Sequence, residues 1–144
     1  MPETDDIKAR VTAEVEAVHA FIAAWFRGEG EQSEAAYKAG LLDRLAPDMV
    51  NIQPSGQTLS LADLVDPIRA AYGVNPDFQI RISDVAVRYV DDDSGLALAT
   101  YLEHQSGARN TVPSSNTRTS SVLFRVSNAS GRLLWLHIHE TAVP

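Results

Sequence analysis

The sequence predicts an α+β fold, with helices in the first half of the chain and an antiparallel sheet in the second. Between residues 7 and 25, apolar side chains recur every three or four positions, which places them on one face of a helix. From residue 78 onward, apolar and polar side chains alternate in runs separated by Asp, Asn, Ser and Gly, as in strands joined by hairpins. We therefore expect helices packed on one face of a mainly antiparallel sheet.

Three helices are expected before the strand-rich half. The first is amphipathic and ends at Gly28, because glycine favours the residue after a helix. The second covers about 33–45, and Pro47 stops it. A short strand at 48–53 follows, where polar and apolar side chains alternate before a Pro-Ser-Gly turn.

The start of the third helix has two interpretations. Ser60 with Asp63 three residues later resembles a capping box, which predicts a helix from there through Tyr72. Pro67 would remove a hydrogen bond inside that helix. Either the helix bends at this proline, or it begins at Asp66.

The predicted strands include one irregularity. Alternation in 78–82 and in 85–89 is out of step by one position, which is what a β-bulge at Ser83-Asp84 would produce. Such a bulge would bend the strand. The remaining strands are expected at 96–105, 117–126 and 133–141.

Composition limits the classes of partner. The net charge of −7, from 12 Lys and Arg against 19 Asp and Glu, argues against nucleic acid or an anionic membrane. The absence of cysteine excludes disulfides and thiolate metal sites, and we expect no cofactor. The acidic start is unlike a secretory signal, and no apolar run approaches the roughly 20 residues that span a bilayer, so we expect a cytoplasmic protein. A length of 144 residues predicts a single domain over 1–144.

The last hairpin predicts which side chains share a face of the sheet. If its turn centres on Ala129, Leu123 faces Trp135 on the outer side, away from the helices. This outer face is too apolar to be left in water, which predicts a homodimer. In the competing interpretation, the register shifts by one residue, Trp135 points inward, and Leu134 and Leu136 point outward. The predicted interface residues are Leu123, Leu133, Trp135, His137 and His139.

The same register places Arg118 opposite Glu140 on the helix-facing side. One interpretation is a charge pair that seals the end of the sheet. The other is that Arg118 faces a cavity and binds an anionic or carbonyl group of a ligand. A preceding hairpin centred near Thr111 would make His104 the neighbour of Arg118, whereas a one-residue shift would place Glu103 there.

Three segments together resemble the NTF2-like superfamily, the cone-shaped fold of ketosteroid isomerases and SnoaL-type cyclases. They are the end of the first helix at 21–29, the strand leading into Gln53-Pro54-Ser55-Gly56, and the final strand from Trp135 to His139. The resemblance covers nearly the whole chain. It implies a cone of three N-terminal helices packed in a strongly bent sheet.

The chain is most similar to the DUF4440-type branch, which includes the association domain of calcium/calmodulin-dependent protein kinase II. That branch has a Thr-Arg pair on the penultimate strand, matched by Thr117-Arg118, and a final Trp and His matched by Trp135 and His139. This chain departs from the pattern because His137 carries its other histidine and Thr141 replaces the second histidine of the motif.

The resemblance also argues against steroid isomerisation. Ketosteroid isomerases place a tyrosine donor where this chain has Phe21, and an aspartate base where it has Gln53. An amide cannot abstract a proton, so this mechanism lacks both its base and its donor. Whether the chain is an enzyme at all is left open.

The favoured hypothesis is a homodimeric domain that binds a small organic ligand in the cone cavity, with an anion as one option. The predicted ligand-binding residues are Arg118, Glu140, His104, Gln53 and Trp25, and no metal site is expected, because Glu140 faces away from His137 and His139. The alternatives are a SnoaL-type lyase, isomerase or hydrolase using His104 or Glu140 as base, and an oligomerisation module without catalysis. His19 is expected to be a histidine at the edge of the core.

Overall fold

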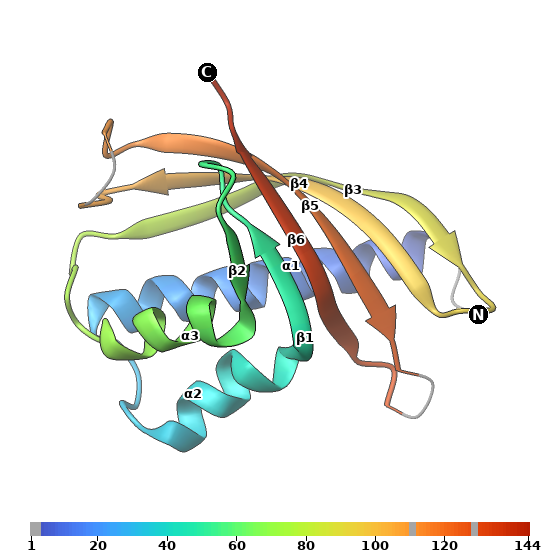
Figure 1. Ribbon diagram of the computed structural model, residues 1–144, viewed down its shortest axis with the longest axis horizontal. Coiled ribbons are helices and arrows are strands. Elements are labelled where there is room, and N and C mark those ends of the chain that lie inside the picture. Colours follow the sequence, from blue (N-terminus) through green and yellow to red (C-terminus); the bar gives the residue numbers. More distant parts are fainter. Residues whose placement is uncertain (1–3, 110–111, 128–129) are drawn as a thin grey trace.

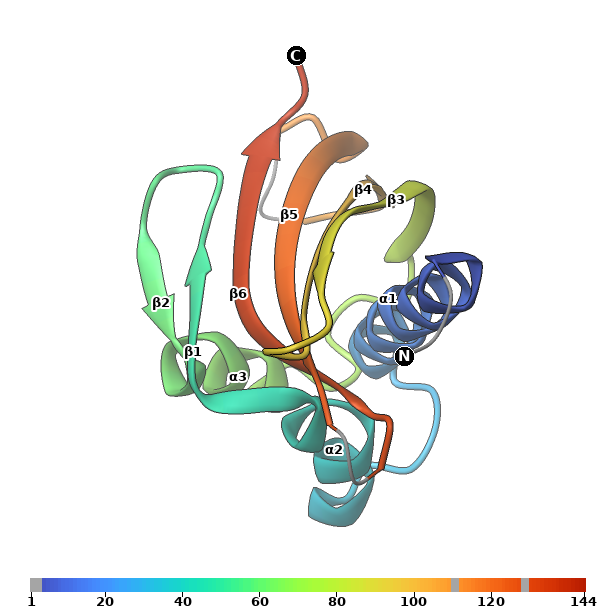
Figure 2. The ribbon, with the colours of Figure 1, turned by 90° about the vertical axis from the view of Figure 1, so that its right-hand side faces the viewer.

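The computed structural model describes residues 4–109, 112–127 and 130–144, and in these ranges three α-helices pack against one six-stranded sheet (Figure 1). The strand order is β2-β1-β6-β5-β4-β3, and every neighbouring pair is antiparallel except β1 and β6. The sheet is strongly curved, and α1 lies along its concave side (Figure 2). The predicted α+β cone with a bent, mainly antiparallel sheet is confirmed.

The first helix supplies much of the core. Its apolar stripe is buried from Ile7 through Val11 and Val15 to Val18, as the spacing predicts. Near its end, Trp25 packs between aromatic rings and donates its indole N–H to the carbonyl of Ile68, at 2.8 Å. The three helices are α1 (Thr4–Arg27), α2 (Glu34–Gly40) and α3 (Leu61–Ala70).

The second helix is shorter than the predicted range of 33–45. Ser33 caps its start by accepting a hydrogen bond from the amide of Ala36. The helix ends at Gly40, which packs so closely on Phe21 that an added Cβ would lie 2.2 Å from the ring. A short 3-10 turn, Leu42–Arg44, then leads directly into β1.

The third helix settles the choice at Pro67. It begins at Leu61, and Ser60 and Asp63 form the predicted capping box by exchanging hydrogen bonds with each other's backbone N–H. Pro67 therefore lies inside the helix rather than at its start. This helix carries residues of the candidate site.

The strands follow the predicted order, with one short addition, β2. The pairing of β3 with β4 shifts between Ser83 and Ala86, and Asp84 has a φ of 55°, so the predicted bulge is confirmed. The strands are β1 (Leu45–Ile52), β2 (Thr58–Ser60), β3 (Gln79–Asp91), β4 (Leu96–Ser106), β5 (Asn116–Val126) and β6 (Leu133–Ala142).

The predicted register of the last hairpin was wrong. The strands pair Val126 with Leu133 near the turn, one residue away from the prediction, whose turn centre Ala129 lies outside the described residues. A bulge in β6 then adds a second residue, so that Leu123 pairs with His137. The one-residue shift reverses the predicted facing at Leu133 and Trp135, and the bulge restores the predicted facing from Ile138 onward.

Trp135 consequently points into the core, as in the competing interpretation. Its side chain is 1% exposed, stacks edge-on against Phe124 and donates its indole N–H to Glu14 at 2.9 Å. Leu133 is buried as well. Both residues are therefore removed from the predicted outer interface, whereas Leu134 and Leu136 are only partly buried.

Candidate functional site

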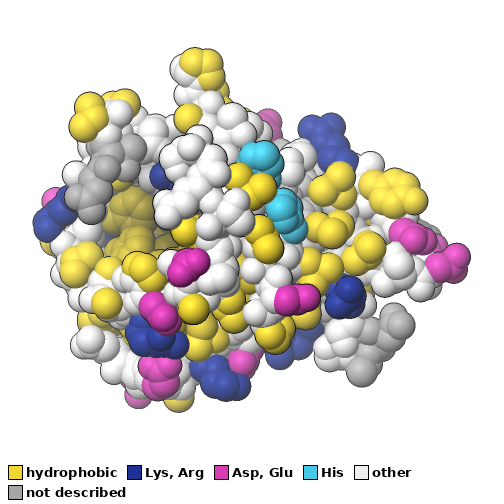
Figure 3. Space-filling model, in the orientation of Figure 1, with side chains coloured by type: hydrophobic (Ala, Val, Ile, Leu, Met, Phe, Trp, Pro, Cys, Tyr) yellow, Lys and Arg dark blue, Asp and Glu magenta, His cyan; other side chains and the backbone are white. Residues whose placement is uncertain are grey.

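A cavity of about 540 Å³ lies between α1, α3 and the concave side of the sheet. Its volume is typical of small-molecule sites. The exposed residues Val74 and Arg109 mark its mouth, where Arg109 donates to the carbonyl of Val74 at 2.7 Å. Figure 3 shows a hollow floored by hydrophobic side chains between α3 and the β4–β5 connection.

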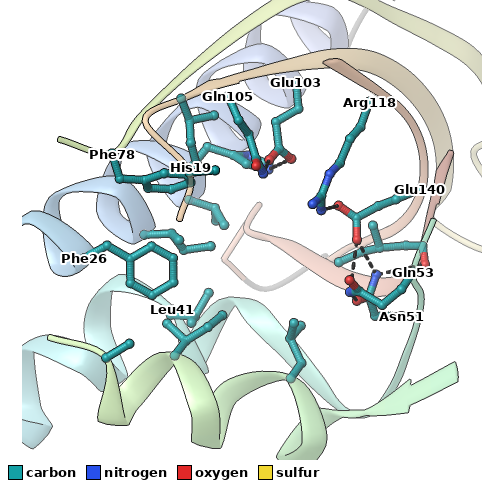
Figure 4. Close-up of a pocket in the computed structure, with 18 of the residues that line it drawn as sticks. His19, Phe26, Leu41, Asn51, Gln53, Phe78, Glu103, Gln105, Arg118 and Glu140 are labelled. Carbon is teal, nitrogen blue, oxygen red and sulfur yellow. Dashed lines mark hydrogen bonds and ion pairs between the residues drawn. The ribbon is translucent and has the colours of Figure 1, made fainter. Parts of the chain in front are cut away.

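One end of the cavity is polar and the other is apolar (Figure 4). Phe26 and Phe78 lie at the apolar end, with their rings 5.3 Å apart in an edge-to-face arrangement. The polar end collects side chains from α1, β1, β4, β5 and β6 and from the residue that directly follows β1. Its members are His19, Asn51, Gln53, Glu103, Gln105, Arg118 and Glu140.

The first polar group surrounds Glu140. Its carboxylate accepts a hydrogen bond from Arg118 at 3.3 Å on one oxygen, and from the amides of Asn51 and Gln53 at 3.2 Å each on the other. The amide of Gln53 also donates to the side-chain oxygen of Asn51. The two-residue register shift keeps Arg118 and Glu140 on the same face, so the predicted pair forms diagonally across the strands.

The second polar group is a buried ion pair between His19 and Glu103. The ring of His19 donates to the carbonyl of Val15 at 2.8 Å and to Glu103 at 3.0 Å. Both partners accept hydrogen bonds, so both ring nitrogens carry a proton and His19 is an imidazolium. Gln105 donates to the second oxygen of Glu103 at 2.5 Å.

Burial and charge act in opposite directions on these groups. Burial opposes the charge on His19, but the Glu103 carboxylate raises the pKa of His19 above its usual 6.5. Burial likewise opposes ionisation of Glu103, but His19 and Gln105 lower the pKa of Glu103 to about 2. Burial and the charge on Glu103 raise the pKa of Glu140, although Arg118 favours its ionised form.

Two predicted site residues lie outside the cavity. β4 pairs with β5 so that Glu103, and not His104, is opposite Arg118, because the register differs by one residue from a turn centred on Thr111. His104 therefore lies on the outer face, between the hydroxyls of Ser83 and Thr117.

Trp25 is a core residue and does not line the cavity. The remaining predicted residues, Arg118, Glu140 and Gln53, do line it. Sequence reasoning treated His19 as a core-edge residue and left out Asn51. The position of Asn51 on β1, two residues before Gln53, which directly follows the strand, is the signal that both face the cavity.

The outer face of the sheet is apolar at its centre. Leu98, Leu123 and His137 form one cross-strand row there, and all three are partly exposed. Leu134 and Leu136 extend this row, and Tyr89 at its edge is 63% exposed. Figure 3 shows histidine side chains among hydrophobic ones on this side of the molecule.

The sequence profile of the family called sucrose-6-phosphate phosphohydrolase C-terminal matches residues 11–144. The chain belongs to this family. A relative, the Arabidopsis thaliana protein "Probable sucrose-phosphatase 2", is 30% identical over 121 residues, which is 84% of this chain. The chain spans only about a quarter of that relative, 27% of its length.

Solved structures similar to this family member have the NTF2-like fold. An NTF2-like protein of unknown function from Pseudomonas aeruginosa is 27% identical, with a TM-score of 0.81 over 94% of this chain and 99% of its own. The association domain of C. elegans CaMKII is 11% identical, with a TM-score of 0.68 over 96% of this chain and 97% of its own. The expected NTF2-like superfamily is confirmed, and the DUF4440-type branch stays a prediction.

Two other features are absent from the described ranges. No helix among the residues described is long and apolar enough to cross a membrane. Nor does that part of the chain bring three or more His, Asp or Glu side chains together in a way that could hold a metal ion.

Proposed function

We propose that this protein is a homodimeric domain that binds a small organic molecule in the cone cavity. The observation that carries the proposal is the division of the cavity into an apolar end, at Phe26 and Phe78, and a polar end around Arg118 and Glu140. Pockets of this kind bury the carbon skeleton of a ligand and use a few placed polar groups to orient it. Gln53 completes the proposed contacts.

The comparisons support a small-molecule role of this type. The family and the Arabidopsis relative are named for a phosphatase of a sucrose phosphate. The chain spans about a quarter of that relative. We therefore take from it only that the ligand is a small organic molecule, and not the phosphatase reaction.

A substitution that fills the cavity tests the proposal. Ala71 lines the cavity, whereas Ala70 is exposed and lies outside it. Small organic molecules, both neutral and charged, are screened for a rise in Tm with wild type, Ala71→Trp and Ala70→Trp. A ligand should stabilise wild type and Ala70→Trp but not Ala71→Trp, because binding to the native state alone raises its stability.

Val74→Trp, at the exposed mouth, serves as a second blocking variant if Ala71→Trp does not fold by circular dichroism. Equal shifts in blocked and unblocked variants would place binding elsewhere. No shift with any compound would overturn the proposal.

An enzymatic alternative is favoured by one observation. Glu140 is a buried carboxyl at the cavity with a raised pKa, and a carboxyl of this kind suits a general base in a SnoaL-type lyase, isomerase or hydrolase. Incubating any ligand found in the screen and following it by NMR distinguishes the two. Turnover by wild type that is lost in Glu140→Gln would favour the enzyme, and an unchanged ligand favours the binding domain.

The homodimer rests on the outer face of the sheet. Four leucines form a contiguous apolar patch at its centre: Leu98, Leu123, Leu134 and Leu136. Single exposed leucines need no partner, but a contiguous patch indicates an interaction surface. A second copy of the chain is the occupant we propose, because a twofold axis lets one face pack on an identical one. The fold neighbour named as the association domain of C. elegans CaMKII supports assembly through this fold.

A further inference from the structure

We infer that the ligand of the cone cavity is a neutral, hydroxyl-rich molecule such as a sugar or a cyclic polyol, and not an anion. This inference rests on the proposed function. Its basis is the way in which hydrogen-bond donors and acceptors alternate at the polar end, together with the charges already present there.

The charges at the polar end are balanced before any ligand binds. His19 is paired with Glu103, and Arg118 is paired with Glu140. All four groups are largely buried, with side-chain exposures of 10% and 5% in the first pair and 21% and 12% in the second. An anionic ligand would add a third negative charge beside two carboxylates, at sites where water screens poorly.

Unused hydrogen-bond donors and acceptors alternate around the polar end of the cavity. Within the described residues, the bond to Glu140 is the single hydrogen bond of Arg118, which leaves most of its five N–H donors for a ligand. Glu140 and Glu103 retain acceptor sites, and the side-chain oxygens of Gln53 and Gln105 accept no bond among the residues described.

A hydroxyl group suits this arrangement because it accepts and donates at the same time. It can accept from the Arg118 guanidinium and donate to the neighbouring Glu140 carboxylate. A carboxylate or phosphate would accept hydrogen bonds from Arg118. It has no proton to donate, so the acceptor oxygens of Glu140 and Glu103 would stay without a donor. The carbon face of the same molecule would pack on Phe26 and Phe78 at the opposite end.

Matched pairs of compounds test this inference by calorimetry. Glucose is compared with glucuronate, and sucrose with sucrose 6-phosphate, so that each pair shares a skeleton and differs in charge. We expect the neutral member to bind at least tenfold more tightly in at least one pair. Tighter binding of the anionic member, or no binding of any neutral sugar or of myo-inositol, would overturn the inference.

The Glu140→Gln variant separates the two ligand classes further. Removing the charged acceptor should weaken a neutral sugar about tenfold, because hydrogen bonds to charged groups are the stronger ones. The same change should strengthen an anion, because one repelling charge is lost. Glu16→Gln, an exposed position on α1 outside the cavity, is the control and should change neither affinity.

The outcome is distinguishable from failure of the proposed function. If a non-sugar compound binds the cavity, as shown by its loss in Ala71→Trp, the binding domain stands and the sugar inference fails. If nothing binds the cavity, both fail.

Discussion

The ion pair of Glu103 and His19 in the cavity wall makes the stability of the fold depend on pH. The folded-state pKa of His19 lies above 6.5, so the folded protein holds this proton more tightly than the unfolded chain does. The stability from this pair is complete below pH 6.5 and declines as the pH rises through the folded pKa. On the acid side, Glu103 contributes above its unfolded pKa of about 4.5 and loses its contribution as the pH falls toward about 2.

Glu103→Gln should therefore reverse the slope near neutral pH. Without its partner, burial lowers the pKa of His19, so the free energy of unfolding should rise with pH through about 6.5 instead of falling. The variant should also lose about 3 kcal/mol, because it leaves a buried charge unpaired. Urea unfolding at pH 5.5 to 8.5 measures both effects. His19→Gln should abolish the dependence of the free energy of unfolding on pH in this range. His139→Gln, at an exposed position on β6, should keep it. Equal slopes in wild type and Glu103→Gln would contradict the assignment to the His19–Glu103 pair.

Single residues of the site were predictable where strand parity alone decided them. The prediction for Arg118 and Glu140 holds because the register error at their end of the hairpin is two residues, which leaves each side chain on its predicted face. The prediction for Gln53 came from the family resemblance. Parity failed for the neighbouring pair on β4. A long polar loop leaves the hairpin centre undetermined by one residue, which was enough to exchange Glu103 for His104.

At the scale of elements, the bulge at Ser83-Asp84 in β3 and the bulge in β6 show what a sequence pattern can reveal. The bulge in β3 was predicted because alternation slips visibly at Ser83-Asp84. The bulge in β6 falls beside Leu133–Leu136, where four consecutive apolar side chains show no alternation and therefore no slip. The direction of Trp135 was decided there by core packing, which the pattern does not contain.

The bulge in β3 predicts an unusual substitution profile. Asp84 has a φ of 55°, which a β-branched residue adopts only with strain, whereas Arg81 on the same strand is exposed and has no such φ. Asp84→Val should cost about 1–2 kcal/mol, while Arg81→Val should be neutral or stabilising, because valine favours strands. Asp84→Gly should be close to neutral. Urea unfolding tests this, and a bulge positioned elsewhere would make both valine variants equally tolerated.

At the scale of the whole molecule, the curvature of the sheet separates two apolar surfaces. The concave side is filled by α1 and the cavity, and the convex side presents Leu98, Leu123, Leu134 and Leu136 to solvent in the isolated chain. Ligand and partner subunit would then use opposite sides of one sheet. A change on the convex side should therefore alter assembly and leave the cavity intact.

Leu98→Glu tests this separation. A stable interface buries about 800 Å² on each partner. A charge at its apolar centre would be buried there without an opposite charge. The variant should therefore sediment as a monomer at the micromolar concentration at which wild type sediments as a dimer. Ala62→Glu, an exposed position on α3, adds the same charge away from the sheet and should remain dimeric. Circular dichroism shows whether Leu98→Glu is folded. A monomeric wild type would remove the homodimer from the proposal, and a dimeric Leu98→Glu would place the interface on another surface.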